Sequence, residues 1–161
     1  MAADILIVED EMVVGLELRK TLDYLGYKTF DVVTEGSDAI ECVENEDIGL
    51  IIMDVELDGD LDGIETTQKI HSQFSVPIVF LTSYSDGDTI KRMEDTGALG
   101  YIFKPFERDD LDKAIGYALS TDQKKTPSLS KGQLLARWLR GFLPPDGLIQ
   151  PLGRRFRLGT I

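Results

Sequence analysis

Short apolar runs alternate along this chain with longer segments in which apolar residues recur every three or four positions. Five of the short runs are rich in β-branched or aromatic residues, a composition typical of β-strands. They cover residues 4–8, 28–33, 50–53, 77–81 and 100–103. Each run is predicted to form one strand.

The segments between these runs have the apolar spacing of amphipathic helices. The first of them ends at Gly26, the second follows Ser37 and the third follows Asp62. In chain order, the apolar positions are Val13, Leu16, Leu18, Leu22 and Leu25; Ala39, Ile40 and Val43; Ile64, Thr67, Ile70 and Phe74; Ile90, Met93 and Leu99; and Leu111, Ile115, Ala118 and Leu119. Strand and helix are therefore expected to alternate five times.

The runs at 50–53 and 77–81 are apolar at consecutive positions, so both faces of these strands are expected to be buried. Such strands are typical of the centre of a parallel sheet that has helices on both sides. We predict a doubly wound α/β domain over residues 1–120. In this architecture ligands bind beyond the carboxyl ends of the strands.

Charge divides the 161 residues into two parts. Residues 1–120 hold nine Lys and Arg against 27 Asp and Glu, a net charge of -18, whereas residues 121–161 hold eight against two, a net charge of +6. The change falls in a polar stretch that ends at Pro127. It predicts an acidic domain followed by a short basic tail, residues 121–161.

Within the tail, residues 130–143 are predicted to form an amphipathic helix with Leu134, Trp138 and Phe142 on its apolar side. Beyond Pro144 the chain is expected to be irregular. Three interpretations stay open: a helix docked on its own domain, a helix that binds a partner or a second copy, and a segment that binds a membrane surface or nucleic acid.

The single cysteine, Cys42, excludes an internal disulfide and any cysteine-rich metal cluster, and it is expected to pack the second helix. His71 is expected to be solvated on the third helix. No apolar run approaches the roughly 20 residues that span a bilayer, and the first residues are acidic where a secretion signal carries positive charge. We expect a cytoplasmic protein with no membrane partner, and among the three interpretations of the tail the one that includes binding to a membrane surface is favoured least.

Polar residues gather where the predicted strands end. They are Glu9, Asp10 and Glu11 after the first strand, Asp54 after the third, Thr82 and Ser83 after the fourth, and Lys104 and Pro105 after the fifth. Carboxylates that share a pocket repel one another and need a cation, and oxygen ligands suit Mg²⁺. With Mg²⁺ and Lys104 neutralising the site, Asp54 can attack a phosphoryl group and Thr82 can hydrogen-bond the product.

These residues resemble the receiver domain of two-component response regulators. The resemblance covers residues 1–120 and rests on five sequence segments, VEDE, MDVEL, DGIE, LTSYS and GYIFKPF. It implies a flavodoxin-like, five-stranded parallel sheet of order 2-1-3-4-5, with Asp54 accepting phosphate from a sensor histidine kinase. Such a protein is a signalling phosphoacceptor that catalyses only its own phosphorylation and dephosphorylation.

The resemblance also implies roles for particular residues. Asp10 and Asp54 would bind Mg²⁺, with Glu9 acting through water and the backbone carbonyl of Glu56 completing the coordination. Thr82 and Tyr101 would form the switch that alters the surface of the fourth helix, fifth strand and fifth helix. The Lys104-Pro105 peptide would be cis. In this family the residues at the positions of Glu56 and Tyr84 tune the lifetime of the phosphorylated state.

The output of the chain has two interpretations. The tail is too short for the usual output domains, so we expect a stand-alone receiver that contacts a downstream protein or phosphotransfer protein, with homodimerisation left open. The alternative is a small DNA-binding transcriptional regulator that acts through the basic tail. The acidic domain itself is expected to repel nucleic acid.

Three rival interpretations fail on particular residues. The run from Asp58 opens like a calcium-binding loop, but its twelfth position is Lys69, where a carboxylate ligand is needed. A haloacid-dehalogenase-like phosphatase needs a second Asp where this chain has Glu56. A flavodoxin-like cofactor protein would need a first loop that binds phosphate, and the acidic loop at Glu9 would repel a phosphate.

The chain departs from the commonest receivers in one loop. The loop at 54–63 is one residue longer than in those receivers.

Overall fold

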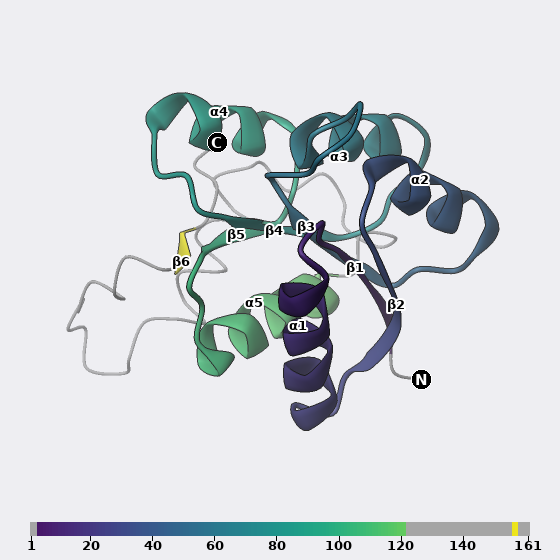
Figure 1. Ribbon diagram of the computed structural model, residues 1–161, viewed down its shortest axis with the longest axis vertical. Helices are drawn as coiled ribbons and strands as arrows, with labels where there is room; N and C mark the ends of the chain where they lie inside the picture. The colour runs from purple at the N-terminus through teal and green to yellow at the C-terminus, as the bar shows by residue number, and fades with distance from the viewer. Residues whose placement is uncertain (1–2, 122–155, 158–161) are drawn as a thin grey trace.

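The structure, a computed structural model, describes residues 3–121 and 156–157 (Figure 1). Strands and helices alternate along the chain, as the apolar pattern predicts. In order they are β1 (Asp4–Val8), α1 (Met12–Tyr24), β2 (Lys28–Val33), α2 (Gly36–Asn45), β3 (Leu50–Asp54), α3 (Gly63–Gln73), β4 (Ile78–Thr82), α4 (Gly87–Asp95), β5 (Gly100–Phe103), α5 (Arg108–Ser120) and β6 (Phe156–Arg157).

The strands form one sheet in the order β2-β1-β3-β4-β5-β6. The first five are parallel, which confirms the predicted order, and β6 is antiparallel to β5. Helices α1 and α5 cover one face of the sheet, and α2, α3 and α4 cover the other (Figure 1). The carboxyl ends of the parallel strands therefore meet at one edge.

Two apolar clusters, one on each face of the sheet, form the core. Alternate residues of one strand enter different clusters, because successive strand side chains point to opposite faces. On β1, Ile5 and Ile7 pack with α1 and α5, whereas Leu6 and Val8 pack with α2 and α3. All four are fully buried. The consecutive apolar positions of the central strands thus supply both clusters at once.

Three predicted strand boundaries move by one residue. The third strand extends through Asp54, and the fourth begins at Ile78 and extends through Thr82. Pro77 has no N–H to donate, although its carbonyl accepts a hydrogen bond from Ile51 N at 2.9 Å. The two polar residues are therefore the last residues of their strands and share the register of the sheet.

The fourth helix is shorter than its apolar spacing suggested. It ends at Asp95, so Leu99 lies in the loop before β5 and not on the helix. Gly97 in this loop has a φ of 79°, a conformation that an L-residue rarely adopts and that ends the helix.

Most of the basic tail, including the helix predicted at 130–143, lies outside the described residues. The expectation of irregular chain is wrong for Phe156 and Arg157, which pair with β5. A two-residue strand has no apolar periodicity of its own. It forms because the edge of a sheet offers unpaired main-chain groups.

His71 is not solvated, so this prediction is also wrong. The residue is half-buried, and its ring nitrogens lie 2.9 Å from the carbonyl oxygens of Thr96 and Val76. The imidazole thereby ties α3 to the loop after α4 and to the start of β4. Cys42 packs partly buried against the core on the α2 side, as predicted. Within the described part of the chain, no helix combines the length and apolar character that crossing a bilayer requires.

Gly63, the first residue of α3, brings this helix against the end of β3. Its N–H donates to the Val55 carbonyl at 3.0 Å. A Cβ at this position would overlap the backbone carbonyl of Asp54. Only glycine allows the helix to begin this close to the strand end that carries Asp54.

Replacing Gly63 by Ala should lower the free energy of unfolding by about 1–3 kcal/mol, because the added methyl group must displace backbone at the end of β3. Urea denaturation measures the change. Gly87, the first residue of α4, has no atom within 4 Å of a built Cβ, so Gly87→Ala is the matched control and should change stability by less than about 0.5 kcal/mol. Equal effects of the two substitutions would contradict this packing argument.

Candidate functional site

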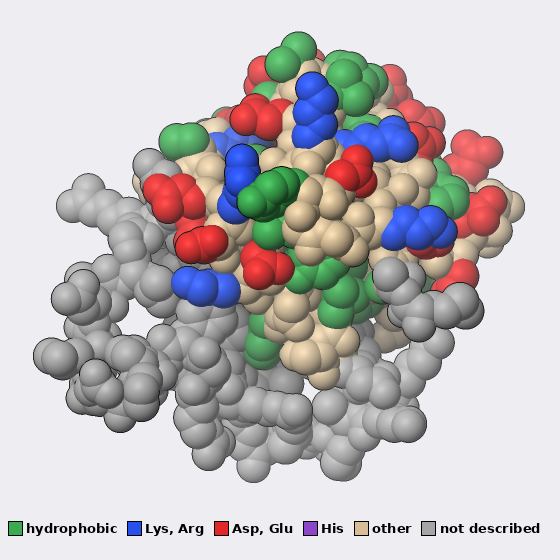
Figure 2. Space-filling view, turned by 90° about the horizontal axis from the view of Figure 1, so that it is seen from below, with side chains coloured by type: hydrophobic (Ala, Val, Ile, Leu, Met, Phe, Trp, Pro, Cys, Tyr) green, Lys and Arg blue, Asp and Glu red, His purple; other side chains and the backbone are tan. Residues whose placement is uncertain are grey.

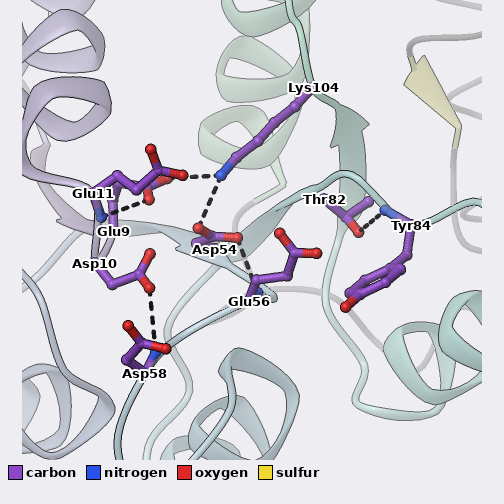
Figure 3. Close-up of polar contacts among 9 residues, drawn as sticks. All are labelled: Glu9, Asp10, Glu11, Asp54, Glu56, Asp58, Thr82, Tyr84 and Lys104. Carbon is purple, nitrogen blue, oxygen red and sulfur yellow. Dashed lines mark hydrogen bonds and ion pairs between the residues drawn. The ribbon is translucent and has the colours of Figure 1, made fainter.

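Four of the predicted site residues meet at the carboxyl edge of the sheet (Figure 3). Asp54 and Thr82 end β3 and β4, Glu9 follows β1, and Lys104 follows β5. Glu9, Asp54 and Thr82 are almost completely buried. The parallel strand order brings together residues that are up to 95 positions apart in the chain.

Lys104 links the two buried carboxylates. Its Nζ lies 2.9 Å from Glu9 Oε2 and 2.9 Å from Asp54 Oδ2. The N–H of the same residue donates to the Thr82 carbonyl at 2.8 Å, which fixes the start of the side chain beside β4. The Lys104-Pro105 peptide is cis, as expected.

Backbone N–H groups hold the remaining carboxylate oxygens. Glu9 Oε1 accepts from Glu11 N at 3.0 Å, and Asp54 Oδ1 accepts from Glu56 N at 3.0 Å. Asp10 reaches the next loop, where its Oδ2 accepts from Asp58 N at 3.3 Å. These bonds orient the acidic side chains before any ligand arrives.

The acidic residues fit a hard divalent cation. Glu9, Asp10 and Asp54 each offer a carboxylate oxygen, and these oxygens lie within 4.8 Å of one another. A set of oxygen donors with room for water is what Mg²⁺ prefers. Glu56 lies beside them with its N–H turned to Asp54, and coordination by its carbonyl stays a prediction.

Burial changes the protonation of this cluster. It raises the pKa of Glu9 to about 7, against a hydrogen bond from Lys104 and with a contribution from the neighbouring Asp54. It also raises the pKa of Asp54, against hydrogen bonds from Lys104 and Glu9. Desolvation opposes charge on Lys104, but the two carboxylates outweigh it and raise the pKa of the ammonium. Lys104 therefore remains charged while Glu9 can hold a proton near neutral pH.

The two candidate switch residues lie on adjacent strands. Thr82 Oγ1 accepts a hydrogen bond from Tyr84 N at 3.0 Å, so the hydroxyl oxygen is turned toward the loop after β4 (Figure 3). Tyr101 is 1% exposed and packs in the cluster on the α4 side, with its ring edge-on to Phe103. The structure thus combines a Thr82 turned toward its own loop with a buried Tyr101.

A cavity of about 420 Å³ opens beside the acidic residues, between the loop after β3 and helix α4. Asp10, Glu56, Tyr84 and Arg92 are among its lining residues. The nearby Glu56 carboxylate raises the pKa of the exposed Tyr84 phenol. Tyr84 and Glu56 therefore stand together at the approach to Asp54.

Arg92 and the role of Asp62 were missed by the sequence analysis. Asp62 caps α3 by accepting from Glu65 N at 2.7 Å, and its other oxygen accepts from Arg92 Nη2 at 2.9 Å. Asp62 therefore has a structural role, because it caps α3 and links this helix to α4. The capping box could be read from the sequence, but the ion pair across 30 residues leaves no local pattern.

The chain matches a known protein family. The model of the response regulator receiver domain family matches residues 5–116, and the chain belongs to this family. Transcriptional regulatory protein PdtaR of Mycobacterium tuberculosis is 38% identical over 116 residues, which cover 72% of this chain and 56% of that protein. The chain therefore spans little more than half the length of this relative.

Other relatives match over nearly their whole length. Sporulation initiation phosphotransferase F of Bacillus subtilis is 29% identical over 116 residues, which cover 71% of this chain and 92% of that protein. The crystal structure of the receiver domain of a Pseudomonas aeruginosa sensor histidine kinase, with a magnesium ion coordinated in its active site cleft, is 29% identical with a TM-score of 0.68. That match covers 75% of this chain and 100% of that chain.

The raised pKa of Glu9 predicts a pH-dependent stability when no cation is bound. An unfolded glutamate ionises near pH 4.5, whereas folded Glu9 keeps its proton up to about pH 7. The stabilisation is therefore complete below the unfolded pKa and is lost as the pH rises through the folded one. In EDTA, the free energy of unfolding should fall between about pH 5 and about pH 8 by about 1 kcal/mol or more beyond any fall in Glu9→Gln, which cannot ionise.

Urea denaturation at the two pH values measures this difference. Glu17→Gln, on the exposed side of α1, is the control and should follow the wild type. A Glu9→Gln variant with the same pH dependence as the wild type would refute the assignment of the proton to this carboxyl.

Proposed function

We propose that this chain is the phosphoacceptor of a two-component phosphorelay and that Asp54 takes a phosphoryl group from a sensor histidine kinase in the cytoplasm. The observation that supports this most is the contact of Lys104 Nζ with Asp54 Oδ2 at 2.9 Å, beside the acidic residues Glu9 and Asp10. Membership of the receiver family and the likeness to a sporulation phosphotransferase also support the proposal.

In the proposed reaction, a carboxylate oxygen of Asp54 attacks the phosphorus of phosphohistidine. An O–P bond forms as the N–P bond to the donor breaks, and the imidazole leaves with its electron pair. Lys104 balances charge on the phosphoryl oxygens. Glu9, Asp10, Asp54 and the Glu56 carbonyl would hold Mg²⁺, which supplies further positive charge there when bound.

The switch is proposed to involve Thr82 and Tyr101. Thr82 Oγ1 now accepts from Tyr84 N, and rotation of its hydroxyl toward Asp54 would provide a hydrogen-bond donor to the phosphoryl group. The loop from Tyr84 to α4 would follow this movement. Since Tyr101 packs in the same cluster as the buried face of α4, the surface of α4, β5 and α5 would change with it.

Intact-mass spectrometry tests the proposed acceptor. After incubation with acetyl phosphate and Mg²⁺, the wild type should gain the mass of one phosphoryl group, whereas Asp54→Asn and a wild-type sample in EDTA should not. Asp58→Asn is the matched control, because Asp58 lies in the neighbouring loop and offers none of the clustered oxygens. It should still be modified. A phosphoryl group on Asp54→Asn would place the acceptor elsewhere.

The partner that delivers phosphate is proposed to dock on α1. Met12, Val13 and Leu16 are 48%, 79% and 46% exposed, although they are apolar. They lie on the helix that begins directly after the acidic residues Glu9 and Asp10. Figure 2 views the molecule from the side of α1 and α5, where apolar side chains lie among charged ones. An apolar surface beside the acceptor suits a helical phosphohistidine domain.

A charge placed on this surface should separate docking from chemistry. Val13→Asp should slow phosphotransfer from an autophosphorylated histidine kinase, selected for transfer to the wild type, by about tenfold. Its modification by acetyl phosphate should not change, because the small donor needs no docking surface. Lys20→Ala, an exposed change further along α1, serves as the control and should behave as the wild type in both assays. Equal transfer from the kinase to Val13→Asp and wild type would exclude this docking surface.

The alternative function is a small DNA-binding transcriptional regulator. It is favoured by the name of the PdtaR relative and by the net charge of +6 on residues 121–161. A gel shift over a salt series, with and without residues 121–161, separates the two functions. DNA retention that depends on these residues would support the alternative, and its absence would leave output through protein contacts.

A further inference from the structure

The far edge of β5 is already occupied by a distant part of the same chain. Phe156 pairs with Ile102 and Arg157 pairs with Tyr101, in antiparallel register. β5 is the last of the parallel strands, so without β6 this edge would present unpaired N–H and C=O groups. In Figure 1, β6 lies beside β5, with α4 on one side and α5 on the other.

Pairing at a sheet edge selects an extended main chain and needs no particular side chain. An antiparallel strand added to the edge of a parallel sheet is also a common arrangement. The opposite edge of the sheet, β2, has no strand added among the described residues. Within residues 3–121 and 156–157, the added strand lies at the edge at β5.

Charge favours a basic segment at this place. The flanking helices α4 and α5 together carry six acidic residues against four basic ones, a net charge of -2. The acidic residues are Asp88, Glu94, Asp95, Asp109, Asp110 and Asp112, and the basic ones are Lys91, Arg92, Arg108 and Lys113. The segment that contains β6 carries Arg154, Arg155 and Arg157 within four residues. An acidic domain of net charge -18 raises the local concentration of a basic segment tethered to it.

We propose that the β5 edge is a docking site for an extended basic segment and that its occupant is the segment of this chain around Phe156–Arg157, bound in cis. The occupied edge belongs to the strand that carries Tyr101, so the docked segment at Phe156–Arg157 covers part of the surface through which the proposed switch would act. The docked segment also withholds this edge from a strand of any other molecule.

Hydrogen exchange of the full chain tests this docking. In an antiparallel ladder, the residues whose N–H groups donate to the neighbouring strand alternate along the chain. Replacing both Phe156 and Arg157 by Pro therefore removes the donating N–H, whichever of the two residues carries it. Exchange of the β5 amides, read in a peptide over residues 98–105, should rise about fivefold or more. Exchange in β2 should not change. Equal β5 protection in the two proteins would overturn the proposal.

A conservative variant and the protein concentration complete the test. Phe156→Leu with Arg157→Lys keeps the main chain and the charge and should protect β5 as the wild type does. High salt should weaken the protection in the wild type, because screening reduces the attraction of opposite charges. Protection that is the same at low and high protein concentration, with a monomer mass by light scattering, supports cis docking. Protection that grows with concentration together with a dimer mass would overturn it in favour of strand exchange between two copies.

Phosphorylation is measured on the same samples. Modification of Asp54 by acetyl phosphate should persist in the double-proline variant, because β6 contributes no residue to the acidic cluster. If the wild type is not modified, the proposed function is refuted, but the hydrogen-exchange measurement still tests the docking of β6. Lost β5 protection with normal modification supports the docking site alone.

Discussion

Two carboxyl groups buried at one sheet edge can carry charge only with a cation between them, and Lys104 is that cation. Glu9 is fully buried and Asp54 is 1% exposed, and Lys104 Nζ lies 2.9 Å from each. Removing Lys104 would leave buried carboxylate charge without its cation, which is strongly destabilising. The side chain extends from β5 past β4 to reach β3 and β1, so its position depends on the order of the strands.

Several local features serve this single contact. The hydrogen bond from Lys104 N to the Thr82 carbonyl sets where the side chain starts. Gly63 lets α3 begin directly against the Asp54 carbonyl, which holds the end of β3 in place. The N–H groups of Glu11 and Glu56 orient the oxygens that Lys104 does not contact. The sheet thus positions the Asp54 carboxylate with its negative charge already partly balanced.

Features with a local pattern were predictable from the sequence, and features that depend on distant contacts were not. Apolar periodicity predicted the five parallel strands and five helices, and polar residues at strand ends predicted the cluster of Glu9, Asp54, Thr82 and Lys104. The hydrogen bonds of His71 to two carbonyls and the pairing of β6 with β5 have no such pattern, because each joins a short element to backbone elsewhere. The Asp62–Arg92 ion pair was missed for the same reason.

Helix α4 is attached to the domain more weakly than the other helices are. Met93 is its one fully buried residue, whereas α5 buries Leu111, Ala114, Ile115 and Ala118. Its remaining attachments include the half-exposed ion pair of Arg92 with Asp62 and the contact of His71 with the Thr96 carbonyl at its end. Elements with few buried contacts open locally at a small fraction of the global free energy of unfolding. We therefore expect α4 to open locally at a lower free energy than the sheet that holds Glu9, Asp54 and Lys104 together.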